Sequence, residues 1–584
     1  MRCVVLRSAL AILLAAGIVP LPGGGGTTPE RTRVIVRMAP GHSSADLHPL
    51  VDRLGGTLGP SLDIIDAQVV ELPNDTIAAL SRHPFIDGIS PDRAVTGTME
   101  RTGATIGATA IRETLGYDGG GVGVAIIDSG ITAWHDDLAS RDGGQRVARF
   151  VDLVADRPNP YDDYGHGTHV AGIIGGDGFD SGGARAGVAP GARLSIFKVL
   201  DGQGNGRISD VIAAFDFILK KNAMLNIRVV NLSVATGVYE SYLTDPLTLA
   251  ARRLVDAGIV VVAAAGNLGR TSDGLYAYGG ISSPGNAPWV LTVGASSHMG
   301  TTARDDDRLA AFSSRGPTAM DHAAKPDLVA PGVGIESLSN PESTLYRSMS
   351  SYLLGGTMQR AYLPYLSLTG TSMAAPVVTG TIALMLQANP ALTPNAVKAI
   401  LHYTAQVYPG YDPLTQGAGF LNAAGAVDLA RVFSELQVPL ADSSWSRHVI
   451  WGNQRLRGGR PAADGTAWAP GVQWGAAHTP AGQTVDWGVR CSDDTCVNAS
   501  AVRWRATCVD ANCQTYNWGT TRNVVWGARC GGGDCQETWT VAAARAESVV
   551  WGTAVDESVV WGTTLVDQSV VWGTALDHSI VWPR

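Results

Sequence analysis

The sequence predicts an α/β fold in which a parallel sheet carries helices on both faces. Between residues 110 and 431, short and continuously apolar runs alternate with longer stretches of helical periodicity. Strands that are covered on both faces have this uninterrupted apolar character. Regular alternation of strands and helices is typical of an open parallel sheet. The expected strands are GVGVAIID, ARLSIFKVL, IRVVNLSV, GIVVVAAAGN and WVLTVGAS, and the helices between them include ISDVIAAFDFILKKN and LTLAARRLVDAG.

The size and composition of the chain indicate several folded domains. With 584 residues the chain is too long for a single core. Its hydrophobic content of 45% and charged content of 16% fit globular protein rather than disorder. The net charge of −9 gives no reason to expect a nucleic-acid partner.

The first residues predict an export signal. Arg2 and Arg7 precede the apolar run Ala9–Val19, and the sequence PLPGGGG follows. The apolar run is too short to span a bilayer and has the positive flank of a secretory peptide. We therefore expect residues 1–26 to be a signal peptide and the protein to be secreted, with an N-terminal membrane anchor as the alternative.

Residues 32–95 predict a small separate α+β domain. The expected order is strand, helix, strand, helix, strand. A connector rich in Gly, Thr and Ala follows over residues 96–109. The three expected strands are RVIVRM, DAQVVEL and FIDGISPDRAV, and the two helices are DLHPLVDRLGG and DTIAALSRH.

Residues 433–584 predict a β-rich repeat region. This segment holds 13 of the 15 tryptophans, and SVVWGT occurs at 548–553, 558–563 and 569–574. A fixed period with β-branched and aromatic residues is typical of short repeated strands. A repetitive, weakly folded tail is the alternative.

The same region holds six of the seven cysteines, and Cys3 lies in the expected signal peptide. An even number of cysteines in an exported chain favours disulfides. We expect pairing within each copy of the spacing Trp-x3-Cys-x4-Cys. The six residues are Cys491, Cys496, Cys508, Cys513, Cys530 and Cys535.

The stretch DYGHGTHVAG places two histidines, His166 and His169, three residues apart. Imidazoles at this spacing can be metal ligands, packing residues or a catalytic base. A zinc helix of the form His-Glu-x-x-His would need a glutamate where Gly167 stands, which disfavours the metal. The stretch alone does not decide between packing and catalysis.

Other polar residues follow the apolar runs, where ligands of a parallel sheet bind. Asp128 ends one run and Asn267 follows another. Ser372 stands between a Gly/Thr turn and an apolar helix, and Pro376 fits the first turn of that helix.

Together these residues supply the groups that acyl transfer needs. A serine hydroxyl becomes a nucleophile when a base takes its proton, and an imidazole is the natural base near neutral pH. A buried carboxylate orients that imidazole, and amide donors stabilise the oxyanion. Ser372, His166, Asp128 and Asn267 fit these four roles.

These motifs strongly resemble the subtilisin-like serine proteases over residues 110–431. The chain order Asp, His, Ser is the order of that family. The matching segments are IIDSG around Asp128, GHGTHVAGII around His166, AAAGN at Asn267 and GTSMAAP around Ser372, supported by VVNLSV, AFSSRGP and KPDLVAPG.

The resemblance implies a subtilisin-like parallel sheet and a secreted serine endopeptidase. It implies that Ser372 attacks the peptide bond, that His166 is the general base and that Asp128 orients it. The Asn267 side chain and the Ser372 amide would form the oxyanion hole. His169 is expected to pack or to orient the helix. The segments implied to bind substrate are Ser233, Val234 and Ala235 on one side and Ala264, Ala265 and Gly266 on the other.

Two features depart from the usual pattern. Ala235 stands where the family usually has glycine, and its methyl group would narrow the substrate cleft. Asn267 and Ser372 are also farther apart than in the simplest relatives. The expected insertions are the acidic run Asp305–Asp307 and the stretch Ser339–Ser367.

The resemblance extends to partners. Residues 32–95 are similar to the inhibitor-type propeptide of the family, which implies an intramolecular inhibitor removed by self-processing within residues 96–109. Substrates would be proteins or peptides. No cofactor is required for the chemistry, and structural calcium is compatible with the family at a site that the sequence does not identify.

Two questions stay open at this point. The chain could be a catalytically silent, subtilisin-shaped binding protein, although its four catalytic-type residues are intact. The tail could bind a cell surface or a polysaccharide, be removed after export, or have no ligand.

Overall fold

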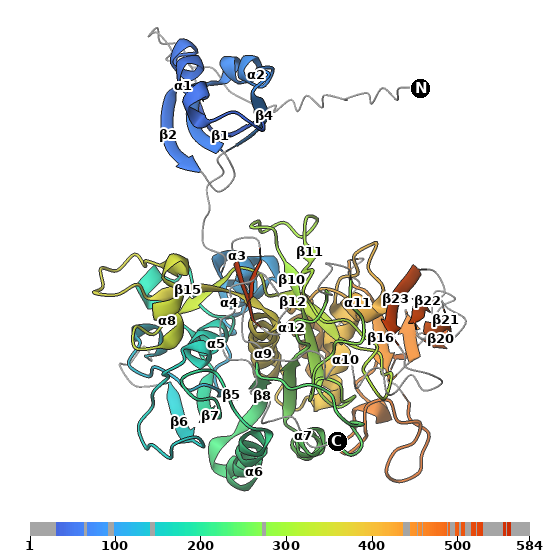
Figure 1. Cartoon of the computed structure of the whole chain (residues 1–584). Coiled ribbons are helices and arrows are strands. Elements are labelled where there is room, and N and C mark those ends of the chain that lie inside the picture. The colour runs from blue at the N-terminus through green and yellow to red at the C-terminus, as the bar shows by residue number, and fades with distance from the viewer. Residues whose placement is uncertain are drawn as a thin grey trace. The chain divides into compact units, whose positions relative to one another are not determined.

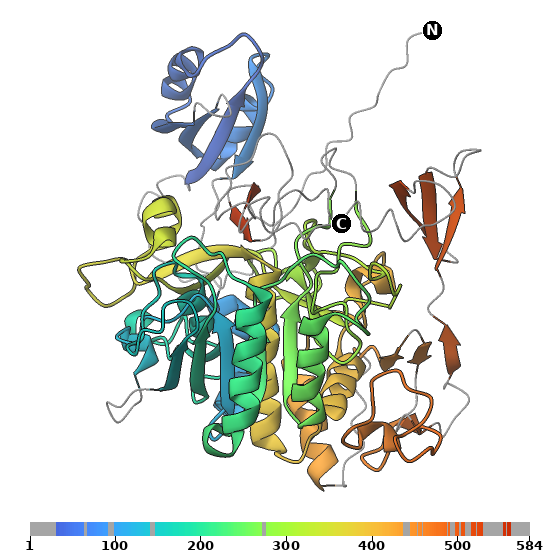
Figure 2. The ribbon, with the colours of Figure 1, turned by 60° about the horizontal axis from the view of Figure 1, so that its bottom comes forward.

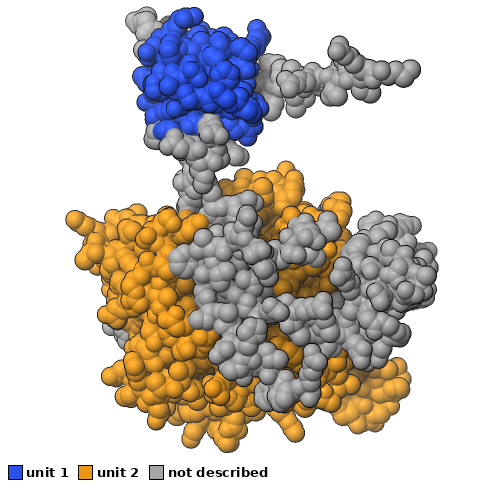
Figure 3. Space-filling view, in the orientation of Figure 1, with its two compact units in different colours: residues 1–96 blue, residues 97–584 orange. Residues whose placement is uncertain are grey.

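The computed structural model describes residues 31–62, 67–91, 99–139, 146–270, 276–435 and 444–452, with shorter stretches between 454 and 561. The chain divides into two compact units, residues 1–96 and residues 97–584 (Figure 3). The expected signal peptide, residues 1–26, lies outside the described residues.

The first unit is a four-stranded antiparallel sheet with two helices. Its strands lie in the order β2-β3-β1-β4. Val34, Val36, Leu47, Val51 and Leu72 form its core. The sequence prediction missed one strand, β2, because its residues TLGPSL carry glycine and proline and lack an apolar run. The elements are β1 (Arg31–Met38), α1 (Ser44–Arg53), β2 (Thr57–Leu62), β3 (Ala67–Pro73), α2 (Ile77–Leu80) and β4 (Ile86–Pro91).

The second unit is built on the predicted parallel sheet (Figure 1). Its strand order is β11-β10-β9-β8-β5-β7-β6, and β12 pairs with β10. The pairs are parallel except β10–β11. The prediction of the fold class is confirmed. The strands are β5 (Gly123–Asp128), β6 (Val147–Asp152), β7 (Arg193–Lys198), β8 (Ile227–Leu232), β9 (Val260–Ala264), β10 (Leu291–Ser297), β11 (Arg308–Leu309) and β12 (Leu328–Pro331).

Helices cover both faces of this sheet (Figure 2). Helix α5 (His166–Gly175) lies between β6 and β7 in the chain, and it packs against α9 (Thr371–Ala388). Helices α6 (Ile208–Leu225) and α7 (Pro246–Asp256) follow β7 and β8 and pack against each other. The helices therefore form two groups, α5 with α9 and α6 with α7.

The strand order reverses between β5 and β8, which are neighbours in the sheet. Crossovers leave this point in opposite directions, so a crevice opens at the carboxyl ends of the two strands. Asp128 ends β5, and Ser233 follows β8 directly. The site is therefore expected at this edge.

Several smaller elements complete the second unit. β13 (Ile335–Leu338) and β14 (Leu353–Leu354) pair with β15 (Tyr365–Gly370), which leads directly into α9. The remaining helices are α3 (Met99–Thr105), α4 (Ala108–Leu115), α8 (Thr344–Ser348), α10 (Pro394–Thr404), α11 (Pro413–Gln416) and α12 (Ala423–Glu435).

Helices α3 and α4 occupy most of the stretch that the sequence suggested as a connector. Ile106, between the two helices, is buried in the main hydrophobic core. The Thr105 hydroxyl donates to the Thr301 carbonyl at 3.2 Å. Small residues mislead a composition-based prediction here, because Ala and Thr also form short helices when one face is buried.

The beginning of the tail packs into the same core as the peptidase fold. Trp445, Trp451, Trp468 and Trp474 are buried in the main hydrophobic cluster. The Thr393 hydroxyl at the start of α10 donates to the Trp468 carbonyl at 2.6 Å. The described residues between 444 and 486 therefore contribute to the core of the second unit.

Beyond residue 486 the described backbone consists of short strands. β25 pairs in parallel with the end of β15, at Thr369 and Gly370. Of the predicted disulfide cysteines, only the backbone of Cys508 is described, so the predicted pairing lies outside the described side chains. The strands from residue 444 on are β16 (His448–Trp451), β17 (Gln454–Arg457), β18 (Arg460–Pro461), β19 (Val489–Arg490), β20 (Val497–Ala501), β21 (Trp504–Cys508), β22 (Thr515–Thr520), β23 (Asn523–Arg529), β24 (Thr553–Val555) and β25 (Ser558–Trp561).

Among the described helices, α9 is the one whose length and hydropathy would suffice to cross a membrane. It is 89% buried in the core of the second unit, so its apolar character is explained by packing.

Candidate active site

Asp128 and His166 form a buried pair. Asp128 is the last residue of β5, and His166 is the first residue of α5. The His166 Nδ1 lies 2.7 Å from Asp128 Oδ1, and neither side chain is exposed. Because a carboxylate only accepts, Nδ1 carries the proton of this hydrogen bond. The contact fixes the tautomer and turns Nε2 away from Asp128.

Ser372 is bound to the end of the strand beside Asp128. Its Oγ donates to the Ser233 carbonyl at 3.0 Å. The Ser233 hydroxyl in turn donates to the Ser372 carbonyl at 2.8 Å. Since Ser233 follows β8 and Asp128 ends the neighbouring β5, both groups lie at the same edge of the sheet.

A second polar contact seats α9 on β8. The Thr379 hydroxyl donates to Asn231 Oδ1 at 2.9 Å, and Asn231 Nδ2 donates to the Ser233 Oγ at 3.0 Å. Asn231 is fully buried. Helix α9 and the Ser233 segment are therefore held together by side chains as well as by packing.

Asn267 and Ser372 offer two donors to the same region. Asn267 Oδ1 accepts from the Thr371 amide at 3.0 Å and from the Thr371 hydroxyl at 2.9 Å. With its oxygen bound in this way, Asn267 turns its Nδ2 away from Thr371. Ser372 is the second residue of α9, where a helical N–H has no acceptor within the helix.

The predicted substrate segments lie at the same sheet edge. Ser233 and Val234 are buried and Ala235 is partly exposed. Ala264 and Ala265 are buried.

Gly266 has a φ of +99°. A Cβ at this position would stand 2.4 Å from the Ser282 Oγ. Only glycine fits there, and the glycine of the AAAGN motif is explained by this close approach.

His169 has a structural role. It is fully buried, and its Nε2 lies 2.9 Å from the Leu366 carbonyl and 3.2 Å from the Ile335 carbonyl. Burial lowers its pKa to about 3, so the ring stays neutral. His169 therefore fastens α5 to β13 and β15, as the sequence analysis expected.

The stretch Ser339–Ser367, which the sequence analysis expects to be an insertion, supports the loop before His166. Asn340 Nδ2 donates to the Asp162 carbonyl at 2.6 Å. The backbone amides of Thr344 and Leu345 donate to the carbonyls of Asp163 and Tyr164. The stretch Ser339–Ser367 therefore braces the entry to α5.

The acidic run Asp305–Asp307, the second expected insertion, contacts Tyr408 through Asp307, whose Oδ2 accepts from the Tyr408 hydroxyl at 3.3 Å. Burial raises the pKa of the Asp307 carboxyl to about 6.

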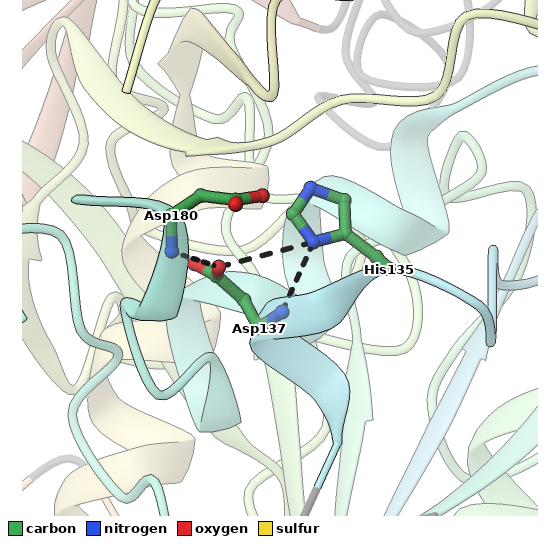
Figure 4. Close-up of side chains that lie close together, drawn as sticks. All are labelled: His135, Asp137 and Asp180. Atoms are coloured by element: carbon green, nitrogen blue, oxygen red, sulfur yellow. Dashed lines mark hydrogen bonds and ion pairs between the residues drawn. The ribbon is translucent and has the colours of Figure 1, made fainter. Parts of the chain in front are cut away.

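His135, Asp137 and Asp180 form a cluster whose ligand atoms lie within 4.8 Å of one another (Figure 4). Calcium takes six to eight oxygen ligands. In this cluster Asp137 Oδ1 accepts from the Asp180 amide at 2.9 Å, and Asp137 Oδ2 accepts from the Tyr365 hydroxyl at 2.8 Å. Asp180 Oδ1 accepts from Arg360 Nε at 2.6 Å. One carboxylate oxygen, Asp180 Oδ2, has no hydrogen-bond partner.

Both ring nitrogens of His135 take part in hydrogen bonds, so neither is available to a metal ion. Its Nδ1 accepts from the Asp137 amide at 3.2 Å, so the proton is on Nε2, which donates to the Pro364 carbonyl at 3.1 Å. The residues present do not fit a divalent metal. The Arg360 guanidinium supplies the positive charge, and its bond to Asp180 raises the pKa of Arg360.

Comparison with known proteins agrees with this geometry. Residues 119–427 match the subtilase family. The chain is 38% identical to the serine protease AprX of Bacillus subtilis (strain 168) over 56% of this chain and 70% of the relative. It is 31% identical to subtilisin E of the same organism, over 66% of this chain and 86% of the relative. It is 32% identical to an extracellular serine proteinase of Thermus sp. (strain Rt41A), over 58% of this chain and 70% of the relative.

The chain therefore belongs to the subtilase family. It is a subtilisin-like serine endopeptidase, and its substrates are proteins.

Two charged contacts of the second unit were not found from the sequence. Lys198 is fully buried at the end of β7, and its Nζ donates to the Ser129 carbonyl at 2.6 Å and to Asp163 Oδ1 at 2.7 Å. A lysine that ends an apolar strand was the available signal. Arg360 left no signal, because the residues it contacts are far away in the chain.

Proposed function

We propose that this chain is a secreted serine endopeptidase whose catalytic triad is Asp128, His166 and Ser372. The observation that carries the proposal is the 2.7 Å contact between Asp128 and His166. Asp128 ends β5, and the Ser372 hydroxyl is bound to the carbonyl of Ser233, which directly follows the neighbouring strand β8. The Asp128–His166 bond leaves Nε2 as the nitrogen that exchanges protons with Ser372.

In the proposed reaction Ser372 Oγ exchanges its resting bond to the Ser233 carbonyl for a bond to His166 Nε2. His166 takes the hydroxyl proton as Oγ attacks the peptide carbonyl. Asp128 stabilises the imidazolium that forms. His166 then protonates the leaving amine, and water hydrolyses the acyl-enzyme by the reverse transfer.

The tetrahedral oxyanion would be bound by Asn267 Nδ2 and by the Ser372 amide. The bonds from Thr371 to Asn267 Oδ1 fix the amide before substrate arrives. A donor held in advance costs no reorganisation during the reaction. The substrate backbone would lie between Ser233–Ala235 and Ala264–Gly266.

Digestion of a peptide library by the matured protein tests the activity and reports its specificity. We expect cleavage by the native chain and none by the Ser372→Ala variant. A chain that binds peptides but cleaves none, with all four residues intact, would favour the silent binding protein instead.

We further propose that residues 32–95 are an inhibitor-type propeptide and that the enzyme removes it. Because α3 begins at Met99 and α4 follows it, we propose that cleavage occurs in the part of the connector before Met99. N-terminal sequencing of the native protein and of Ser372→Ala checks this. Normal maturation of the Ser372→Ala variant would show that another protease cuts.

Finally, we propose that the peptidase domain extends to residue 486 and that residues 487–584 form the separate extension. The support is the burial of Trp445, Trp451, Trp468 and Trp474 in the main core. A chain ending at residue 486 should keep activity and thermal stability, whereas one ending at residue 435 should lose both. Equal behaviour of the two truncations would return the boundary to residue 431.

Secretion through residues 1–26 and disulfides in the extension belong to the same proposal. Signal cleavage is checked by sequencing the exported protein, and the pairing of its six extension cysteines by non-reducing peptide mapping. Free thiols would count against an extracellular location. A ligand at the cell surface or a polysaccharide remains our proposal for the extension, to be tested by retention of the intact chain on such surfaces.

A further inference from the structure

Asp162 is a buried carboxylate that the proposed mechanism does not use. It lies four residues before His166 and is 1% exposed. Its Oδ1 accepts from the Ser129 hydroxyl at 2.8 Å and from the Gly165 amide at 2.7 Å. Its Oδ2 accepts from the Thr168 amide at 2.8 Å and from the Thr168 hydroxyl at 2.7 Å. Four donors on one carboxylate are unusual for a group that only fills space.

The four donors come from two segments that carry the triad. Ser129 follows Asp128, and its amide donates to Asp128 Oδ1 at 2.8 Å, the same oxygen that meets His166. The Ser129 hydroxyl also accepts from the Gly167 amide at 2.8 Å. Asp162, Ser129 and the first turn of α5 therefore close a ring of hydrogen bonds around the Asp128–His166 pair.

The helix cannot make this cap with its own side chains. Its N-cap residue is Gly165, with a φ of +105°. A Cβ on Gly167 would stand 2.3 Å from the Gly130 carbonyl oxygen. The close approach of α5 to the loop after β5 requires glycine at these positions. The orphan amides of the first turn must then be satisfied by a residue outside the helix.

The carboxylate also lies where the helix favours a negative charge. His166 is the first residue of α5, at the positive end of the helix dipole, and Asp162 is bound to the same turn. The other ionisable groups around this turn are Asp128 on β5, the buried Tyr164 before α5, the neutral His169 on α5, and Lys198 on β7 with its partner Asp163.

We propose that Asp162 is a positioning residue for the proposed triad, which holds the Asp128 strand end against the His166 helix. The inference rests on the proposed roles of Asp128, His166 and Ser372. It makes Asp162 part of the activation of Ser372 without contact with substrate.

The test is the separate measurement of kcat and KM for Asp162→Asn in the matured protein. Asparagine keeps the shape but replaces one accepting oxygen by an NH2 group that faces N–H donors. We expect kcat to fall about 10- to 100-fold with little change in KM, since displacement of a catalytic group by about 1 Å costs about 100-fold.

Two further variants separate the parts of the proposal. Asp163→Asn removes the neighbouring negative charge and keeps an acceptor for Lys198, so kcat should change little. Ser129→Ala opens the hydrogen-bond ring but keeps the Asp162 carboxylate, so kcat should fall with little change in KM. This variant also tests the ring if Asp162→Asn fails to fold.

The outcomes are distinguishable from failure of the proposed function. A native chain that cleaves no peptide would overturn the triad itself. An active native chain with an Asp162→Asn variant of unchanged kcat would overturn the positioning role. A variant whose loss of activity follows only its loss of folded protein, with an unchanged kcat per folded molecule, would show that Asp162 is merely structural.

Discussion

Two buried histidine–aspartate groups lie close together in this chain and differ in what their surroundings do to the imidazole. In one, His166 Nδ1 meets the Asp128 carboxylate at 2.7 Å. In the other, His135 Nδ1 is 4.0 Å from Asp137 Oδ1 and accepts from the Asp137 backbone amide instead. His135 lies between β5 and β6, His166 begins α5 after β6, and both are buried.

The difference shows that proximity of a histidine to an aspartate does not define a catalytic pair. At His166 the carboxylate binds the protonated nitrogen, which directs the basic nitrogen away from it. At His135 the basic nitrogen caps a turn and the protonated one is bound to Pro364. The second ring has no nitrogen left for proton transfer. Mutations that treat the two groups identically should therefore have different effects.

The largest difference is expected between Asp128→Asn and Asp137→Asn. Loss of the orienting carboxylate in a serine protease triad lowers kcat by about 10,000-fold. In the second variant the asparagine oxygen would still accept a hydrogen bond, and burial already raises the pKa of the Asp137 carboxyl. We expect kcat/KM for a peptide substrate to collapse in the first variant and to stay within a few-fold in the second. Similar losses in both would abolish the distinction.

A third buried histidine sharpens the comparison through pH. Burial lowers the pKa of His169 to about 3, below the unfolded value near 6.5. The unfolded chain therefore takes up a proton between these values that the folded chain does not. The resulting loss of folding stability is absent above pH 6.5 and increases as the pH falls, reaching about 4 kcal/mol near pH 3. Unfolding of the inactive Ser372→Ala chain across this range checks it, and adding His169→Gln should flatten the dependence.

Asn267→Ala tests the oxyanion donor. In subtilisin, a member of the same family, removal of the corresponding donor costs about 100- to 1,000-fold in kcat. We expect a similar loss here with little change in KM, because the donor acts on the transition state. An equal rise in KM without a fall in kcat would indicate that Asn267 binds substrate in the ground state.

The smallest effects are expected at the second cluster. Arg360→Gln removes the cation that pairs with Asp180, and we expect a small loss of folding stability because Arg360 is partly exposed. Addition of calcium or of a chelator should not shift the unfolding temperature through this cluster. Arg347→Gln, on the same insertion but exposed, is the control.

A calcium-dependent stabilisation that Asp180→Asn abolishes would contradict the assignment of Arg360 as the cation. Stabilisation that survives Asp180→Asn would indicate a calcium site elsewhere in the chain.

The sheet was predictable because its strands are buried on both faces and therefore read as apolar runs. The residues at the ends of those runs, Asp128 and Asn267, were predictable for the same reason, since parallel strands deliver their carboxyl ends to one edge. Strand β2 was missed because a Gly-Pro strand has no apolar pattern. Helices α3 and α4 were missed because their small residues resemble a linker.

Contacts between distant segments were beyond the sequence. Nothing near Arg360 indicates that it neutralises Asp180, because the two are brought together only by the folded insertion. The burial of Trp468 and Trp474 was equally hidden, since their neighbours resemble the tryptophan repeats that follow. The sequence pattern predicts the secondary structure in which a residue lies. Its contact partners in distant segments become visible only in the folded structure.

The central claim is that His166, held by Asp128, activates Ser372. Its most direct test is labelling of the matured protein with a fluorophosphonate probe, followed by mapping of the labelled residue by mass spectrometry. We predict labelling at Ser372 in the native chain and in His135→Gln, and none in folded His166→Gln. Labelling that persists at Ser372 in His166→Gln, or that is lost equally in folded His135→Gln, would contradict the account.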